Sequence, residues 1–208
     1  MREFNYNYWE PLSIDELNQL LNGLACNWYL AGGYAIEQFI GQSIRKHGDI
    51  DVLIERKDQH LIQDFMSAWQ LFWATNPGLR LWEQDEFLGE DIQDIWCRRD
   101  AHSAWQLQLM LFDEKDGSWI FKRNPSIKLP LNQIYHTSES GMKYLKPEIQ
   151  LLYKAKKDTL SKDQLDFDAS LPLLVEDSKT WLLDQLKVQF PEGHPWISTL
   201  KAAQSRET

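Results

Sequence analysis

One stretch near the N-terminus, residues 28–54, constrains the fold of this chain more than any other. A short apolar run at residues 28–31 is typical of a buried strand. Two glycines follow it, and residues 34–40 have the pattern of a short helix. A polar connector then leads into a second apolar run at residues 49–54. The stretch therefore predicts a strand, a glycine turn, a helix and a second strand in quick succession.

The second predicted strand opens with two carboxylates, Asp49 and Asp51. Side chains alternate faces along a strand, so the two carboxylates are expected to point the same way, about 7 Å apart. Ile50 and Val52 are expected to point into the opposite layer. Two carboxylates aimed at one spot repel each other unless a cation lies between them, and Mg²⁺ is commonly bound by one or two carboxylates together with substrate phosphates. The pair therefore predicts a metal site.

Gly32 and Gly33 supply the second half of the predicted site. Glycine lets the backbone approach a phosphate closely, and the N-terminus of the following helix offers free N–H groups and the positive end of its dipole. A phosphate cradle beside a carboxylate pair is the layout of metal-assisted nucleotidyl transfer. Each piece alone is common, because a D-x-D pair often lies in a solvated loop and Gly-Gly is often a plain turn. The combination on one strand–helix–strand frame is more specific.

Composition limits the classes of partner. The chain has 208 residues, 43% of them apolar and 25% charged, which suffices for one sizeable core with a small appended domain. A net charge of −9 argues against a nucleic-acid binder; it suits a small cationic substrate, and it is also typical of an ordinary soluble surface. Cys26 and Cys97 have neither metal-ligand nor disulfide spacing, so a cytoplasmic location is expected. The sequence shows no signal peptide, and no apolar run reaches the roughly 18 residues of a membrane span.

The hydrophobic pattern divides the chain near residue 140. A capping box at Ser13 and Glu16 predicts a first helix. A helix is expected from Asp58 to Trp69, with Leu61, Ile62, Phe65 and Trp69 on one apolar stripe. The further expected elements are strands at 70–73 and 79–82 around a turn at 76–78, a short element at 92–98, a strand at 104–112, a turn at 113–117, a strand at 118–122, and helices at 148–157, 161–169, 178–189 (capped by Ser178) and 196–203. This order predicts an α+β fold, with a mixed sheet in residues 1–140 and a helical domain in residues 141–208.

The segment AGGYAIEQFIGQSIRKHGDIDVLI resembles the nucleotidyltransferase superfamily typified by DNA polymerase beta. It looks more like the bacterial branch that includes the aminoglycoside 2''-adenylyltransferases and the lincosamide nucleotidyltransferases, whose motif is GG-x-A, then G-x-x-x-R-x-H, then D-x-D. The matching residues here are Gly32, Gly33, Ala35, Gly41, Arg45, His47, Asp49 and Asp51. The resemblance is strong over residues 28–56, looser over residues 145–167 and faint elsewhere.

The resemblance implies a nucleotidyltransferase-type mixed sheet flanked by helices, with residues 141–208 as a helical acceptor domain. The implied activity is Mg²⁺-dependent transfer of a nucleoside monophosphate from ATP or another NTP to a hydroxyl, with two ions when nucleotide is bound. By residue match, Asp49 and Asp51 are the catalytic metal ligands. The residues implied to meet the triphosphate or support its loop are Gly32, Gly33, Arg45 and His47.

The sequence departs from this superfamily at one position. Its members usually add a third carboxylate from a neighbouring central strand, as a metal ligand or as the base for the acceptor hydroxyl. The position that aligns here is Gln108, which cannot accept a proton at neutral pH and is a weaker Mg²⁺ ligand than a carboxylate. Asp113 or Glu114, at the end of the same predicted strand, is a possible substitute. Glu86 and Asp91 are further candidates.

Other polar and aromatic residues have both a functional and a structural interpretation. Lys154 and Lys156 either reach the triphosphate or form a solvated helix face. The same choice between a site and a surface or core position applies to Lys122, Arg123, Lys162, Asp163, Asp166, Trp73, Trp82, Trp96 and Trp119.

Three functional classes remain open. The favoured class is a nucleotidyltransferase that acts on a small hydroxylated acceptor, which the acidic balance suggests is cationic. The second is a toxin–antitoxin-type nucleotidyltransferase that modifies a protein or an RNA. The third is a catalytically impaired nucleotide-binding protein, which Gln108 favours. A monomer and a homodimer both fit.

Overall fold

The computed structural model describes residues 5–75 and 77–205. Its centre is a mixed sheet of ten strands in the order β4-β3-β5-β6-β2-β1-β10-β9, with β7 paired to β6 and β8 paired to β7. The strand bounds are β1 Trp28–Ala31, β2 Asp51–Glu55, β3 Gln70–Thr75, β4 Gly78–Leu81, β5 Asp94–Arg98, β6 Leu107–Lys115, β7 Ser118–Ile120, β8 Lys128–Pro130, β9 Tyr135–Thr137 and β10 Lys143–Leu145. The β2–β6 and β1–β10 pairs are parallel, and the others are antiparallel.

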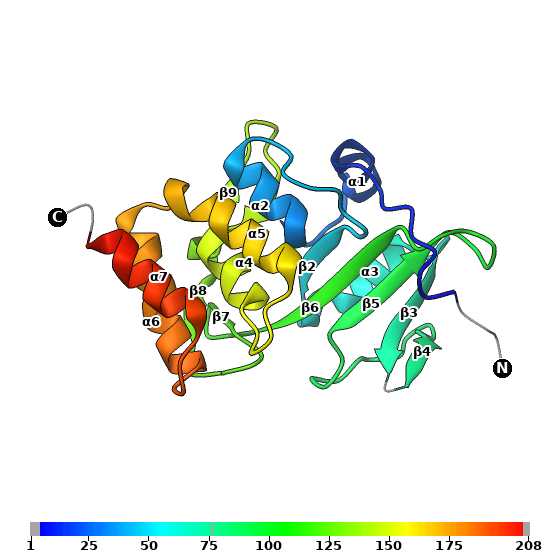
Figure 1. Cartoon of the computed structure of the whole chain (residues 1–208). Helices are drawn as coiled ribbons and strands as arrows, with labels where there is room; N and C mark the ends of the chain where they lie inside the picture. Colours follow the sequence, from blue (N-terminus) through cyan, green and yellow to red (C-terminus); the bar gives the residue numbers. More distant parts are fainter. Residues whose placement is uncertain (1–4, 76, 206–208) are drawn as a thin grey trace.

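Helices cover both faces of this sheet, which confirms the predicted α+β class (Figure 1). In Figure 1 the helices near the C-terminus gather at one end of the sheet, and α3 lies behind it. None of the helices in the described ranges is long and apolar enough to cross a membrane. The helix bounds are α1 Ile14–Leu21, α2 Gly32–Ile40, α3 Gln59–Phe65, α4 Pro147–Lys154, α5 Ser161–Ser170, α6 Glu176–Gln189 and α7 Pro195–Gln204.

Strand alternation separates two hydrophobic clusters, one on each face of the sheet. On β2, Val52 and Ile54 pack with the cluster that includes residues of α1 and α3, whereas Leu53 packs with the cluster that includes residues of α2 and α4–α7. Ile50 and Val52 are fully buried in the first cluster, as the sequence predicted. Asp51 lies two residues before Leu53 on the same strand, so its side chain points to the same face, the one that α2, α4 and α5 cover.

Several predicted elements form as expected at the N-terminal end. The capping box is present, because the Glu16 N–H donates to Ser13 Oγ at 3.2 Å and the Ser13 N–H donates to Glu16 Oε2 at 2.8 Å.

Asp49 differs from the prediction, because β2 begins at Asp51 and leaves Asp49 in the loop before it. The turn predicted at 76–78 includes residue 76, which lies outside the described residues.

The helix predicted from Asp58 to Trp69 is shorter and rotated. A 3₁₀ turn precedes it, Asp58 forms no side-chain cap, and the helix ends at Phe65. Ile62 and Met66 face the core, whereas Leu61 and Phe65 are 44% and 39% exposed. The burial predicted for Ile62 is therefore confirmed, and that predicted for Leu61 and Phe65 is wrong. The rows 61/65 and 62/66 are neighbours on the helix, so sequence spacing alone did not show which of them is fully buried.

The C-terminal region also differs in detail. The helix predicted to begin at Ser178 begins at Glu176, and its N-cap residue, Val175, forms no side-chain cap. Strand β10 pairs in parallel with β1, Leu30 opposite Tyr144, so the sheet continues past residue 140 and the helices begin at Pro147. The division of function between residues 1–140 and 141–208 stays a prediction.

The buried and exposed leucines give a direct test of this packing. Leu109 on β6 is fully buried, so Leu109→Ala is expected to lower the free energy of unfolding by about 2–5 kcal/mol. The matched change Leu61→Ala, on the exposed row of α3, should alter it by no more than about 0.5 kcal/mol. Urea unfolding followed by circular dichroism measures both values. A large loss in Leu61→Ala would contradict the helix orientation.

Candidate active site

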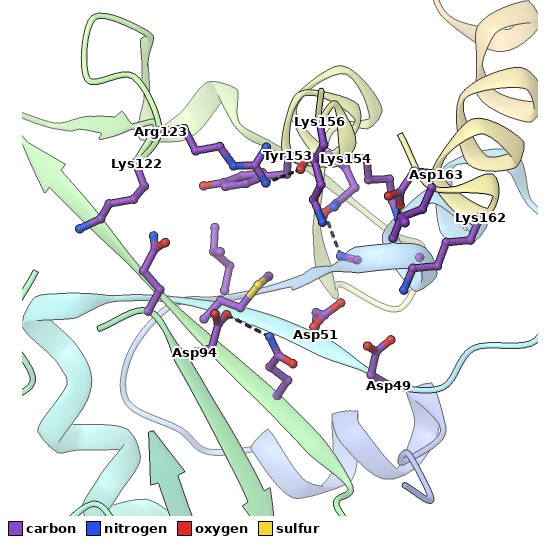
Figure 2. Close-up of a pocket in the computed structure, with 18 of the residues that line it drawn as sticks. Asp49, Asp51, Asp94, Lys122, Arg123, Tyr153, Lys154, Lys156, Lys162 and Asp163 are labelled. Carbon is purple, nitrogen blue, oxygen red and sulfur yellow. Dashed lines mark hydrogen bonds and ion pairs between the residues drawn. The ribbon is translucent and has the colours of Figure 1, made fainter. Parts of the chain in front are cut away.

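A cavity of about 350 Å³ lies between the sheet and the helices α2, α4 and α5. It brings together residues that are far apart in the sequence, including most of those that the motif singled out. The predicted site residues that line it are Gly32, Gly33, Arg45, Asp49, Asp51, Gln108 and Lys154. Further charged residues in its wall are Asp94, Lys122, Arg123, Lys156, Lys162 and Asp163. In Figure 2, Asp49, Asp51 and Asp94 lie along the sheet and the labelled lysines and Arg123 lie across the cavity from them.

Asp49 and Asp51 form a strained pair at the base of the cavity. Within residues 5–75 and 77–205, neither carboxylate forms a hydrogen bond or ion pair with another residue. Burial, and then the negative charge of Asp49, raise the pKa of Asp51 to about 7, and the positive charge of Lys154 opposes this shift. The protein therefore holds two acids together without a partner of its own for either.

The pair fits a divalent cation by its chemistry. In the described part of the chain, no group of three or more His, Cys, Asp and Glu side chains is arranged to hold a metal ion. Two carboxylates with open coordination positions match Mg²⁺, which keeps several waters and takes substrate phosphate oxygens as further ligands. A bound cation would also offset the charge of Asp49, which adds to the effect of burial in raising the pKa of Asp51.

The two glycines are required by close contacts within the protein. Gly32 has φ +66°, and a Cβ atom there would collide with the carboxylate of Asp51. A Cβ atom at Gly33 would collide with His47 and with the guanidinium of Arg45. Gln150 Oε1 accepts a hydrogen bond of 2.8 Å from the Gly32 N–H. The glycines thus let the start of α2 pack directly against the acidic pair and the connector that precedes it.

Arg45 and His47 are both held by carboxylates. Arg45 donates from Nε and Nη2 to the two oxygens of Asp166 on α5, at 2.8 and 2.9 Å. His47 Nε2 lies 2.9 Å from Glu37 Oε1, and its ring packs on that of Tyr34 with centroids 4.3 Å apart. These contacts fix the connector between α2 and β2 and thereby position Asp49.

Positive charge on the opposite wall comes mainly from the region between α4 and α5. Lys154 Nζ lies 2.7 Å from Asp166 and 3.2 Å from Asp163. Arg123, beyond β7, donates to the carbonyl oxygens of Ala155 and Tyr153 at 2.9 and 2.7 Å. Lys122, Lys156 and Lys162 also line the cavity. A wall of lysines and an arginine facing two unpaired carboxylates can bind a polyanion together with a metal ion.

The candidate substitutes for the third acid do not line this cavity. Strand β6 continues to Lys115, so Asp113 lies inside the strand and not at its end. Its Oδ1 accepts a 2.6 Å bond from Arg56 Nε. Asp113 and Glu114 line a separate cavity with Arg56 and Lys57. Glu86 and Asp91 are likewise outside the wall of the main cavity.

The structure instead brings Asp94 of β5 to the cavity, a residue that sequence analysis did not single out. Gln108 Nε2 donates to Asp94 Oδ1 at 3.0 Å. Burial raises the pKa of Asp94, and the hydrogen bond from Gln108 opposes this. The available signal was weak, because Asp94 lies in a stretch whose strands were poorly defined by the sequence.

A second cavity of about 510 Å³ adjoins the first and shares Asp49 and Gln108 with it. The aromatic residues Tyr6, Trp9 and Trp96 line it, and the Trp96 ring contacts both of the others, with centroids 6.2 and 4.9 Å apart. Of the tryptophans considered for stacking, Trp96 is therefore the one placed beside the acidic pair. Trp82 and Trp119 are buried in the protein.

The raised pKa of Asp51 predicts a pH dependence of stability. The unfolded chain releases this proton near 3.8 and the folded protein near 7, so stability falls as the pH rises through this window. Without divalent cations, Asp51→Asn should be more stable than wild type at about pH 8, and the difference should shrink towards about pH 4. Urea unfolding at several pH values measures it. Asp184→Asn, on an exposed part of α6, serves as the control and should follow wild type; a pH-independent effect of Asp51→Asn would contradict the assignment.

Comparison with known proteins agrees with the motif. Residues 13–77 match the model of the aminoglycoside-2''-adenylyltransferase family. Among curated proteins, no sequence matches this chain. Three of the solved structures that match this chain share its fold at low identity, the first being the lincosamide antibiotic adenylyltransferase LnuA bound to lincomycin, with a TM-score of 0.54, 16% identity, and coverage of 79% of this chain and 100% of that one.

The other two are structures of ANT(2'')-Ia. The crystal structure, in complex with adenylyl-2''-tobramycin, has a TM-score of 0.52 and 14% identity, and covers 94% of this chain and 97% of that one. The solution structure has a TM-score of 0.54 and 12% identity, and covers 86% and 91%. The matched family and these neighbours are nucleotidyltransferase enzymes. The chain thus has the fold of the antibiotic nucleotidyltransferases, and its residues 13–77 match the aminoglycoside-2''-adenylyltransferase family, the branch that the GG-x-A and D-x-D motif indicated.

Proposed function

We propose that this protein transfers a nucleoside monophosphate from ATP or another NTP to a hydroxyl of a small-molecule acceptor, with Mg²⁺. The observation that carries the proposal is the pair Asp49 and Asp51, which have no partner in the described chain and face a wall of lysines in one cavity. A nucleoside triphosphate and a divalent cation complement both walls at once.

In this proposal Asp49 and Asp51 hold Mg²⁺, which neutralises phosphate charge and orients the attack. The lysines of the opposite wall bind the triphosphate as mobile point charges. Lys154 is shared between Asp163 and Asp166, and Asp166 also binds Arg45, so the position of Lys154 is fixed before a substrate arrives. Preorganised charge of this kind stabilises a developing negative charge without reorganisation.

The second cavity supports a site for the acceptor. It meets the first at Asp49 and Gln108, so an acceptor in it and a nucleotide in the first cavity would approach the acidic pair from two sides. The rings of Tyr6, Trp9 and Trp96 offer flat apolar faces to a ring of the acceptor. The structural neighbours bind lincomycin and adenylyl-2''-tobramycin, so lincomycin and tobramycin are the first acceptors to assay.

Binding of nucleotide tests the proposed site directly. Titration calorimetry with ATP and with GTP in the presence of Mg²⁺ should detect binding of at least one nucleotide to wild type. Asp51→Asn should weaken this binding by at least about tenfold, because a neutral amide replaces a charged metal ligand. Asp184→Asn, on an exposed part of α6, should bind as wild type does. Absence of binding to wild type at millimolar nucleotide would refute the proposal, and equal binding by Asp51→Asn would refute the metal role of that residue.

Removal of one aromatic ring tests the acceptor site. Tyr6 is 45% exposed, so Tyr6→Ala is expected to leave the fold intact. The loss of one ring contact should raise the KM for the acceptor by about fivefold while leaving the KM for ATP unchanged. Steady-state transfer of AMP to tobramycin and to lincomycin measures both constants. The change Tyr8→Ala, of a tyrosine that is equally exposed but outside the cavity, is the control, and an equal effect of both changes would place the acceptor elsewhere.

A further inference from the structure

Asp51, Gln108 and Asp94 line the cavity from three neighbouring strands of the sheet. Asp51 on β2 is paired with Gln108 on β6, and Gln108 is paired with Trp96 on β5. Asp94 lies two residues before Trp96, so its side chain lies on the same face of the sheet as those of Gln108 and Asp51. Figure 2 shows Asp94, its hydrogen bond to Gln108, and Asp51 along this line. The carboxylate of Asp94 thus lies on β5, one strand further from Asp51 than β6, which carries Gln108.

Asp94 is the carboxylate left free to take a proton. The wall of the cavity holds four acids in its described residues, Asp49, Asp51, Asp94 and Asp163, and Asp163 is paired with Lys154. The metal pair needs the negative charge of Asp49 and Asp51. The described residues place no third acid with that pair in a common metal site, so Asp94 is not positioned as a third ligand.

Gln108 gives Asp94 a defined orientation. Its amide donates to Oδ1 at 3.0 Å, and within the described chain Oδ2 forms no hydrogen bond. Asp94 lines the cavity, so an amide that fixes Oδ1 leaves Oδ2 without a partner and available to accept a proton from a hydroxyl within hydrogen-bond reach. Glutamine at position 108 therefore has a role that a carboxylate there would not fill, because a carboxylate has no proton to donate to Asp94 at neutral pH.

We propose that Asp94 accepts the proton of the acceptor hydroxyl, and that Gln108 is the positioning residue that holds it. The inference rests on the proposed nucleotidyl transfer. In the step, the acceptor oxygen forms a bond to the α-phosphorus, and the bond from that phosphorus to the bridging oxygen of the leaving group breaks. Pyrophosphate departs with the electron pair, and the hydroxyl proton passes to Asp94 Oδ2. The third acid has in effect moved from β6 to β5.

Four variants test this assignment in two assays, ATP binding by calorimetry and AMP transfer to tobramycin, to lincomycin and to water. Asp94→Asn should reduce kcat about a hundredfold or more while changing the Kd for ATP less than about threefold. Gln108→Glu should also lower kcat, because it removes the N–H donor and places a second negative charge beside Asp94. Asp91→Asn, the same change at an exposed position outside the cavity, is the control and should behave as wild type.

The double variant Asp94→Asn with Gln108→Glu is the decisive one. It returns the acid to β6 and lets the amide at position 94 donate to the carboxylate at position 108. We expect its kcat to be at least about tenfold higher than that of Asp94→Asn. Changes at two independent sites would not be coupled in this way. A double variant no faster than Asp94→Asn would refute the exchange of the acid between the two strands.

The remaining outcomes separate this inference from the proposed function. Unchanged transfer by Asp94→Asn, with active wild type, would overturn the role of Asp94 alone. Loss of ATP binding together with kcat would make Asp94 a binding residue and overturn its role as proton acceptor. Wild type that binds ATP but transfers AMP to none of the three acceptors would overturn the proposed transfer, and the proton step with it.

Discussion

The repulsion between Asp49 and Asp51 is the constraint around which this structure is arranged. Burial of Asp51, and then the negative charge of the nearby Asp49, raise the pKa of Asp51, so the charged pair is unfavourable here. The fold holds them there by placing β2 between β1 and β6 at the middle of the sheet and by burying Val52 and Ile54 beneath them. Packing of the apolar layer thus supplies the free energy that an unpaired acid pair costs, as is common where structure serves function.

The contacts around this pair tie the helical region to the sheet. The connector that carries Arg45 and His47 is anchored on α5 through Asp166 and on α2 through Glu37. The same Asp166 holds Lys154 on α4. A single buried carboxylate therefore links the loop that positions the acids to the helix that presents positive charge. This network explains how two regions with different secondary structure form one cavity.

The third carboxylate expected on β6 is replaced by Gln108, and the neighbouring strand β5 brings Asp94 to the cavity instead. Taken alone, a glutamine in place of an acid indicates impaired catalysis. Beside Asp94 it is a hydrogen-bond donor to a carboxylate that faces the same cavity. Backbone pairing of β5 with β6 makes this relation possible, because neighbouring strands bring side chains of one face within hydrogen-bond reach.

The sequence by itself determined the order of the elements from Ser13 to Glu55 and the acidic pair beside the start of β2. Capping and strand alternation are local properties, so the capping box and the burial of Ile50 and Val52 follow from neighbouring residues. The two glycines, expected as a turn before the helix, are instead the first residues of α2. Helix α3 was predicted less well, because two equivalent rows of apolar side chains competed for the core.

Only the tertiary structure decided which charged residues join the acidic pair. Asp113 was the nearer candidate along the chain, but β6 continues past it and Arg56 holds it in another place. Asp94 joins the cavity through strand register, and Lys154 joins it through the packing of α4 beside α2. Register and helix packing are set by contacts between residues that are far apart in the sequence, and no local pattern encodes them.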